Sequence, residues 1–254
     1  MEFSGRVAIV TGGATGIGRA VCESLVRAGA RAVVVNYSRS RDEAEETAAA
    51  VRELGAQAVA SQANVADEEQ VRAMVADTLE RFGHLDILVN NAGTTRFIPH
   101  PDLDALTDEV WDQIFSVNLK GTFYCSRAAG SELRRSRGAI VNVASIAGIR
   151  ASGSSIPYGV SKAGVMQLTR GLAVALAPEV RVNAVAPGLV ATRWFRQSWG
   201  DDRADEQERE MEAGTPLQGV ATAEHVAQAI LGLLASDFVT GQTIIVDGGR
   251  SIKY

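Results

Sequence analysis

Residues 6–18 read RVAIVTGGATGIG, and this stretch decides the fold. Its first part, residues 6–11, is a short apolar run of the kind that is buried in a parallel sheet. The glycines that follow let the backbone approach a phosphate closely, and an amphipathic helix runs from about Gly16 to Ala28. A glycine turn alone is often only a tight connection. Because this one lies between a strand and a helix N-terminus, it predicts a site for a nucleotide pyrophosphate.

The alternation of strand and helix continues along the whole chain. Further strands are predicted at residues 32–37, 56–62, 85–90, 139–144, 181–186 and 242–247, and helices at 42–54, 67–82, 107–134, 157–177 and 223–236. Strands that alternate with helices imply right-handed crossovers and a parallel sheet that is covered on both faces. We therefore predict one α/β domain over residues 1–254, a doubly wound Rossmann fold with a central parallel sheet of about seven strands.

Composition and charge exclude several classes of function. The net charge of −5 gives no basic footprint for nucleic acid or for an acidic membrane surface, so neither is expected as a partner. No apolar run approaches the length of a membrane span, and we expect no signal peptide and a cytoplasmic location. Cys22 and Cys125 lie in apolar helical patterns, which predicts buried thiols in a reducing compartment. The three histidines are scattered, so no metal site is expected.

A second informative stretch, residues 154–164, reads SSIPYGVSKAG. Serine and proline mark the start of a helix, and Tyr158 and Lys162 lie four residues apart on one face of it. A phenol has an ordinary pKa of about 10, and an ammonium beside it lowers that pKa towards neutrality. The pair therefore predicts a general acid–base catalyst, the alternative being an incidental tyrosine and a solvated lysine.

Five segments, spread over the whole chain, form a recognisable set. They are the glycine turn Thr11 to Gly18, the segment Asn90-Asn91-Ala92-Gly93, the set Asn118, Ser145, Tyr158 and Lys162, the turn Pro187-Gly188-x-Val190-x-Thr192, and the ending Val246-Asp247-Gly248-Gly249. In these segments the chain resembles the short-chain dehydrogenase/reductase family, and in overall pattern it is similar to members that are 3-oxoacyl carrier-protein reductases.

The resemblance implies four catalytic residues. Ser145 would hold the substrate oxygen near the phenol of Tyr158, which donates a proton during reduction and takes one during oxidation. Lys162 would lower the phenol's pKa and bond the nicotinamide ribose, and Asn118 would tether a water that relays protons. The alternative for Ser145 is a hydroxyl that satisfies local backbone groups. The alternative for Asn118 is a structural residue that bonds a neighbouring strand.

The end of the second strand favours NADP(H) over NAD(H). Residues 36–39 read NYSR, with no carboxylate to bind the adenosine ribose before Asp42. Arg39 can grip a 2′-phosphate, and Ser38 can add a hydrogen bond. The alternative is that Arg39 points into solvent and Asn36 serves NAD. The predicted cofactor-binding residues are Gly12, Thr15, Gly16, Ile17, Gly18, Asn36, Ser38, Arg39, Asn64, Val65, Asn91, Ala92, Gly93, Tyr158, Lys162, Pro187, Gly188, Val190 and Thr192.

Two of these residues depart from the family's usual pattern. Thr15 stands where many NADP(H) users carry a basic residue in the glycine turn. Asn64 replaces the aspartate that the family usually offers to the adenine, although its carbonyl oxygen can still accept that bond.

The substrate side is expected to consist of residues 94–98, residues 146–156 and a lid around 190–216. The lid contains Trp194, Phe195 and Trp199, which would either stack on a substrate or pack within the protein. Seven acidic residues against two arginines in 201–212 would repel an acidic carrier protein. A basic cluster, Arg134, Arg135 and Arg137, could dock such a partner, or form a solvated helix end.

These features predict an oxidoreductase that transfers a hydride between NADP(H) and a small ketone or secondary alcohol, in the manner of a 3-oxoacyl reductase. The alternatives are an NAD-dependent sugar or polyol dehydrogenase and a catalytically silent cofactor-binding protein. The small or apolar faces around Phe123, Gly164 and Gly171 resemble the family's tetramer interfaces, and they predict a homotetramer.

Overall fold

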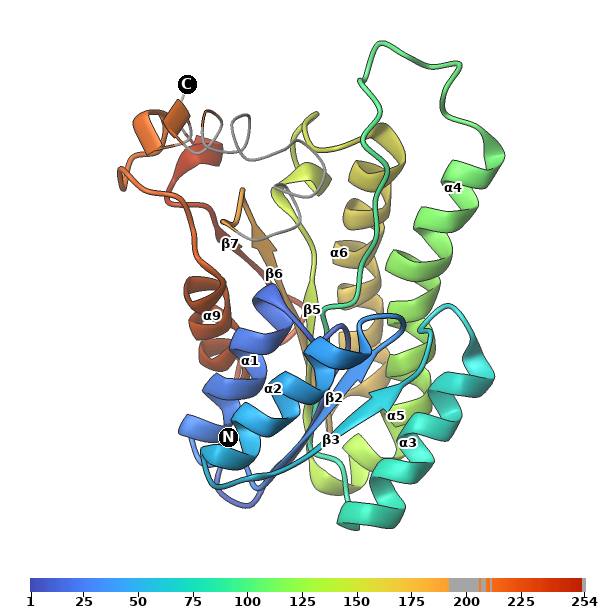
Figure 1. Cartoon of the computed structure of the whole chain (residues 1–254), viewed down its shortest axis with the longest axis vertical. Coiled ribbons are helices and arrows are strands. Elements are labelled where there is room, and N and C mark those ends of the chain that lie inside the picture. Colours follow the sequence, from blue (N-terminus) through green and yellow to red (C-terminus); the bar gives the residue numbers. More distant parts are fainter. Residues whose placement is uncertain (192–205, 207–208, 211, 253–254) are drawn as a thin grey trace.

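The computed structural model describes residues 1–191, 206, 209–210 and 212–252, and its centre is a seven-stranded parallel sheet (Figure 1). The strands are β1 (Val7–Val10), β2 (Ala32–Tyr37), β3 (Gln57–Gln62), β4 (Ile87–Asn90), β5 (Ala139–Val143), β6 (Arg181–Pro187) and β7 (Thr243–Val246). Their order is β3-β2-β1-β4-β5-β6-β7, so the order reverses between β1 and β4. The predicted doubly wound Rossmann fold is thus confirmed.

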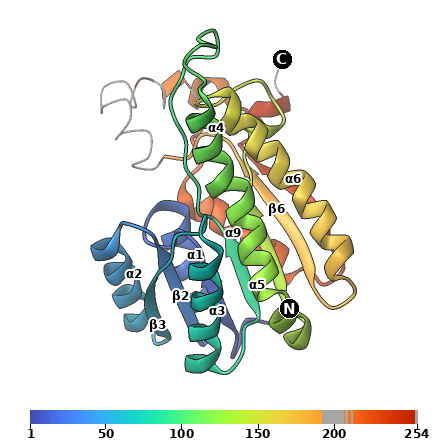
Figure 2. The same ribbon diagram turned by 90° about the vertical axis from the view of Figure 1, so that its right-hand side faces the viewer.

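Helices cover both faces of the sheet. They are α1 (Gly16–Arg27), α2 (Arg41–Glu53), α3 (Glu68–Phe82), α4 (Asp108–Phe115), α5 (Thr122–Ser136), α6 (Ile156–Leu176) and α9 (Ala223–Ala235). One layer consists of α1, α2 and α9, and the other consists of α3, α5 and α6 (Figure 2). A parallel sheet needs this double cover because both of its faces are apolar.

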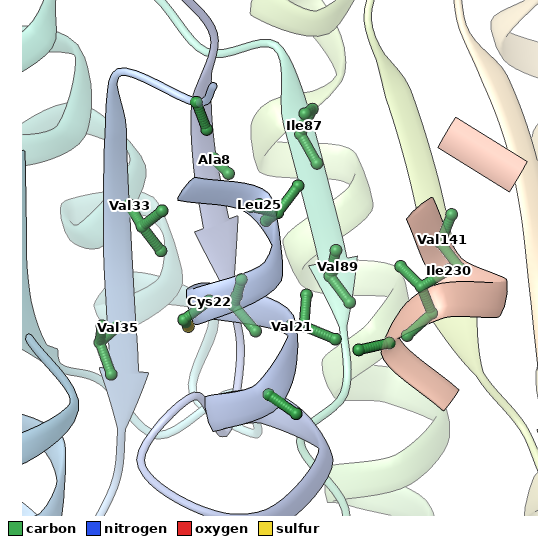
Figure 3. Close-up of a cluster of buried hydrophobic side chains, with 14 of the residues drawn as sticks. Ala8, Val21, Cys22, Leu25, Val33, Val35, Ile87, Val89, Val141 and Ile230 are labelled. Atoms are coloured by element: carbon green, nitrogen blue, oxygen red, sulfur yellow. The ribbon is translucent and has the colours of Figure 1, made fainter. Parts of the chain in front are cut away.

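Each face of the sheet has its own hydrophobic core. Between the sheet and α1, Val21 and Leu25 pack among Val33, Val89 and Ile230, the last of which comes from α9 (Figure 3). Burial of a valine or leucine side chain contributes about 1.5–3 kcal/mol. Both cysteines are buried free thiols, and burial raises their pKa above the ordinary value, to about 12 for Cys125. They are inert packing residues.

The register of the strands brings four loops to one edge of the sheet. Val10 pairs with Val89, Asn90 with Asn142, and Val143 with Val185. The loops that leave β1, β4, β5 and β6 therefore start side by side at the carboxyl edge. In open α/β sheets this is the edge where ligands bind, at the point where the strand order reverses.

The predicted helix over 107–134 is present, but a π-helical turn interrupts it. The turn, η1 (Ser116–Gly121), joins α4 to α5. Asn118 lies in this turn. It is 1% exposed, and its side chain hydrogen-bonds Thr94 in the loop after β4 and Ser161 in α6. The Thr122 hydroxyl donates to the Asn118 carbonyl at 2.8 Å and satisfies it. Such π-bulges are frequent at functional sites.

Most of the predicted lid, with Trp194, Phe195 and Trp199, lies outside the described residues. So does Thr192, one of the predicted cofactor-binding residues. Within the described part of the chain, no helix is long and apolar enough to cross a membrane. The same part holds no group of three His, Cys, Asp or Glu side chains that could bind a metal ion. The cytoplasmic location stays a prediction.

Candidate active site

A cavity of about 690 Å³ opens at the carboxyl edge of the sheet, where β1, β2 and β4 end. It is lined by the glycine turn and the start of α1, by the last residue of β2 and the three that follow it (residues 37–40), and by residues 91–97 after β4. The sequence placed Gly12, Thr15, Gly16, Ile17, Ser38, Arg39, Asn91, Ala92 and Gly93 at a cofactor site, and all nine line this cavity.

The glycine turn leaves no room for side chains. A Cβ on Gly18 would lie 2.2 Å from the carbonyl oxygen of Gly12, and a Cβ on Gly12, whose φ is +61°, would lie 3.0 Å from the Cα of Ala92. The N-cap of α1, Thr15, uses no side-chain hydrogen bond to cap the helix. A narrow turn in front of a helix N-terminus fits the pyrophosphate of a dinucleotide, because free N–H groups and the helix dipole favour an anion there.

Asn91 and Thr11 lock this turn to the loop after β4. The Asn91 Nδ2 donates to the carbonyl oxygens of Thr11 and Gly12, both at 3.0 Å. The Thr11 hydroxyl accepts from the backbone N–H groups of Asn91 and Ala92, also at 3.0 Å. The two walls of the cavity are therefore held at a fixed separation before any ligand binds.

Ser38 and Arg39, which follow β2, are exposed, whereas Asn36, inside the strand, is buried. Ser38 and Arg39 are exposed and line the cavity. Asn36 is 1% exposed and lies beneath the turn: its Oδ1 accepts from the Gly12 N–H at 3.2 Å, and its Nδ2 donates to the carbonyls of Ser61 and Ala63. Its side chain thus braces β1, β2 and β3.

Two further predicted cofactor residues follow β3. Asn64 is exposed, and its Oδ1 accepts from the N–H of Ala66 at 3.1 Å. Val65 is 5% exposed, and a Cβ on Gly121 would lie 2.8 Å from its Cγ2, so the π-helical turn packs directly against it. Neither residue lines the cavity.

Ser145, Tyr158 and Lys162 come together where β5 ends. Ser145 follows β5 in extended backbone and caps the short 3₁₀ turn η2 (Ile146–Gly148), its Oγ accepting from the N–H of Ala147 at 3.2 Å. Its hydroxyl also hydrogen-bonds the phenol of Tyr158. Lys162, one turn further along α6, donates from Nζ to the carbonyl of Val143 at 2.7 Å.

Burial decides the pKa values of this group. Desolvation raises the pKa of the Tyr158 phenol above 10.0, and the hydrogen bond with Ser145 opposes the rise. Burial also lowers the pKa of Lys162 from 10.5 to about 8. The expectation was that Lys162 lowers the phenol's pKa. In the structure its Nζ lies 5.7 Å from the ring centroid, and Ser145 is the group that favours the phenolate.

Asn118 holds the loop after β4 against α6. Its Oδ1 accepts from the N–H of Thr94 at 2.8 Å, and its Nδ2 donates to the carbonyl of Thr94 and to the Ser161 hydroxyl, both at 3.0 Å. The Ser161 hydroxyl in turn donates to the carbonyl of Tyr158 at 2.7 Å. This bracket connects the cavity wall to the backbone of the tyrosine.

The remaining predicted residues follow β6. Pro187 is the last residue of that strand and pairs with Val246, and the N–H of Gly188 donates to the carbonyl of Val246 at 3.0 Å. Val190 is buried and forms a parallel bridge with Ala221. These residues border the same edge of the sheet from the side of β7.

Two of the segments predicted for the substrate side are joined to each other. The hydroxyls of Thr95 and Ser154 hydrogen-bond each other, and the N–H of Ile98 donates to the carbonyl of Ser154, so the loops after β4 and β5 are connected. Ser161 is the residue beside the site that sequence reasoning missed. Its place three residues after Tyr158, on the same helix, was the only available signal.

Comparison with known proteins agrees with this geometry. Residues 12–251 match a family model described as enoyl-(acyl carrier protein) reductase. The chain is 48% identical over 247 residues to a protein of Streptomyces violaceoruber named as ketoacyl reductase 2 of the granaticin polyketide synthase, covering 97% of this chain and 96% of the relative. It is 38% identical over 247 residues to the 3-oxoacyl-acyl-carrier-protein reductase FabG of Staphylococcus aureus, covering 95% and 96%.

A solved structure from Burkholderia xenovorans, described as a short-chain dehydrogenase/reductase, superposes with a TM-score of 0.90 at 35% identity, covering 98% of this chain and 99% of that one. The family model and the relatives each span nearly the whole chain. Together with the glycine turn and the Ser145–Tyr158–Lys162 group, they show that the chain belongs to the short-chain dehydrogenase/reductase family and is a nicotinamide-dependent oxidoreductase.

Proposed function

We propose that the protein uses NADPH to reduce a ketone of the 3-oxoacyl type to the secondary alcohol. The observation that carries the proposal is the convergence of Ser145, Tyr158 and Lys162 at the carboxyl edge of the sheet, where β5 ends. A protein that only binds a cofactor has no use for a phenol, a hydroxyl and a buried ammonium in one place. The ketoacyl reductase names of the relatives support the choice of substrate class.

The roles of the side chains follow from their positions. The bound nicotinamide supplies a hydride to the carbonyl carbon. The Ser145 hydroxyl holds the carbonyl oxygen, and Tyr158 gives its phenolic proton to that oxygen as the carbon–oxygen double bond becomes single. Lys162, whose pKa burial lowers to about 8, would return a proton to the phenolate near neutral pH. Asn118 positions the loop and the tyrosine backbone.

The preference for NADPH rests on the exposed end of the cavity. Ser38 and Arg39 line it where the adenosine ribose would lie, and residues 36–39 offer no carboxylate that would repel a 2′-phosphate. A guanidinium binds a phosphate through two parallel hydrogen bonds. NAD(H) is the alternative cofactor, and it would be favoured only if Arg39 contributed nothing.

We also propose a homotetramer. The edge strand β7 exposes Ile244 and Ile245, and Phe238 and Val174 are fully or largely exposed, at 105% and 81%. An exposed apolar edge strand is a liability unless another chain covers it. Phe123, on α5, belongs to another face that was predicted to form an interface. Its ring stacks with Arg127, whose guanidinium carbon lies 4.8 Å from the ring centroid. Light scattering at micromolar concentration should give four times the mass of the chain, and a monomer would contradict this.

The function is tested by following nicotinamide absorbance with a panel of ketones. The panel includes 3-oxoacyl thioesters of a small thiol, the same acyl groups on a carrier protein, and sugars in the oxidative direction with NAD. We expect turnover of the small thioesters with NADPH. Tyr158→Phe should keep the fold and the cofactor affinity while kcat falls by roughly 10²–10⁴-fold. Faster turnover of sugars with NAD would replace this proposal, and a variant with more than a tenth of the wild-type rate would remove Tyr158 from it.

A further inference from the structure

The turn that carries Ser145 and the helix that carries Tyr158 meet without intervening side chains. Three glycines line this contact: Gly148 at the end of η2, Gly153 in the loop that follows, and Gly159 in the first turn of α6. We call this contact the glycine seam. The acid–base chemistry of Ser145, Tyr158 and Lys162 does not itself require glycine at these three positions.

The closest approach is at Gly148. A Cβ on this residue would lie 2.6 Å from the backbone nitrogen of Ala163 and 2.8 Å from the carbonyl carbon of Lys162. A real Cβ is essentially never closer than 3.0 Å to another heavy atom, so the backbone would have to move by at least 0.4 Å (3.0 − 2.6). The φ of Gly148 is not positive, so the close approach, and not backbone conformation, excludes a side chain there.

The other two glycines make room around Ala147. A Cβ on Gly159 would lie 2.9 Å from the carbonyl oxygen of Ala147, and one on Gly153 would lie 2.9 Å from the Ala147 Cβ and 3.4 Å from the Cδ1 of Tyr158. Ala147 is the residue whose N–H donates to the Ser145 hydroxyl. Gly153 therefore lies between Ala147, the partner of one catalytic side chain, and the ring of another.

We infer that Gly148 and Gly159 are positioning residues, which set the separation between the Ser145 hydroxyl and the Tyr158 phenol by letting η2 lie directly on α6. The inference rests on the proposed reduction. Ser145 lies three residues before Gly148, in the same short turn, whose N–H group at Gly148 donates to the Ser145 carbonyl at 3.0 Å. A displacement at Gly148 is thus passed to Ser145 through a rigid turn, while Lys162 stays anchored to β5 through Val143.

The expected effect of Gly148→Ala follows from this geometry. A misplacement of about 1 Å in a catalytic site can cost about 100-fold in rate, so a shift of about half that should lower kcat by about tenfold. The hydrogen bond from Ser145, which favours the phenolate, would also lengthen. In the oxidative direction, which needs the phenolate, the rise of kcat/KM with pH should therefore move to higher pH. The KM for the cofactor should change less than kcat, because the seam lies apart from the glycine turn.

Gly232→Ala is the matched control. Gly232 lies in α9, outside the seam, and a Cβ there meets nothing within 4 Å. This variant should keep the wild-type kcat and pH profile, and it should be slightly more stable, since alanine favours a helix over glycine by up to about 1 kcal/mol. Gly159→Ala, which demands a shift of only about 0.1 Å (3.0 − 2.9), should show the same changes as Gly148→Ala to a smaller degree.

The inference would be overturned by Gly148→Ala with the wild-type kcat and pH profile, or by Gly159→Ala with a larger effect than Gly148→Ala. If Gly148→Ala does not fold, Gly159→Ala decides alone, and an unchanged pH profile in it counts against the inference. An ultraviolet titration of the phenols, taken as a difference from Tyr158→Phe, gives a readout without turnover. A wild type with no ketone reductase activity would refute the proposed function, whereas a phenol pKa unmoved by Gly148→Ala would refute the seam.

Discussion

Replacing Lys162 by methionine should change how the stability of the protein depends on pH. The Lys162 side chain is 4% exposed, and burial lowers its pKa from 10.5 to about 8. Between these two values the unfolded chain binds a proton that the folded protein does not, so the free energy of unfolding rises with pH across this interval. The two pKa values differ by about 2.5, and a difference of one in pKa corresponds to about 1.4 kcal/mol. The free energy of unfolding should therefore rise by about 3 kcal/mol across this interval.

The assay is urea unfolding of both proteins below pH 8 and above pH 10.5, at one protomer concentration because association affects stability. Both proteins carry Tyr158→Phe, so that the phenol does not titrate. Between the two pH values, the free energy of unfolding of the protein with lysine should rise by about 3 kcal/mol more than that of the methionine variant. Parallel dependence on pH would show that the ammonium is not desolvated at this position. The offset at low pH is not diagnostic, since methionine also leaves the Val143 carbonyl without its donor.

Three further substitutions test the cavity and its supports. Arg39→Ala should raise the KM for NADPH and leave that for NADH unchanged, as steady-state kinetics with both cofactors will show. Gly18→Ala, whose Cβ would meet the Gly12 carbonyl at 2.2 Å, should weaken dinucleotide binding by at least about tenfold in a fluorescence titration, and wild-type affinity would contradict the narrow turn. Ser161→Ala should cost about 1 kcal/mol in urea unfolding, because it removes a hydroxyl that bonds Asn118 and the backbone of Tyr158.

The sheet and its order of elements could be predicted from the sequence because buried parallel strands appear as short apolar runs, and β2, for example, is entirely buried. The π-helical turn could not be predicted in this way. The apolar spacing of residues 107–134 continues through it, and the residue that distinguishes it, Asn118, bonds Thr94 and Ser161, which are distant in sequence.

The chemistry of the site was predictable to a similar extent. The four-residue spacing of Tyr158 and Lys162 places them on one face of a helix, whatever the rest of the chain does. The pKa directions depend instead on burial, which arises from the packing of α6 against β5 and η2 and does not follow from the spacing of the two residues. The seam was hidden for the same reason, since the spacing of Gly148 and Gly159 says nothing of what approaches them.

The position of Asn36 limits how the cofactor preference of this enzyme can evolve. Its amide nitrogen donates to the carbonyls of Ser61 and Ala63, and its oxygen accepts from the N–H of Gly12. An aspartate here has no N–H groups and would place a charge among carbonyl oxygens, so it would weaken the sheet. Variation at the exposed Ser38 and Arg39 carries no such penalty. Substitutions that change the dinucleotide preference are therefore expected at Ser38 and Arg39 in the loop after β2, and not at Asn36 within the strand.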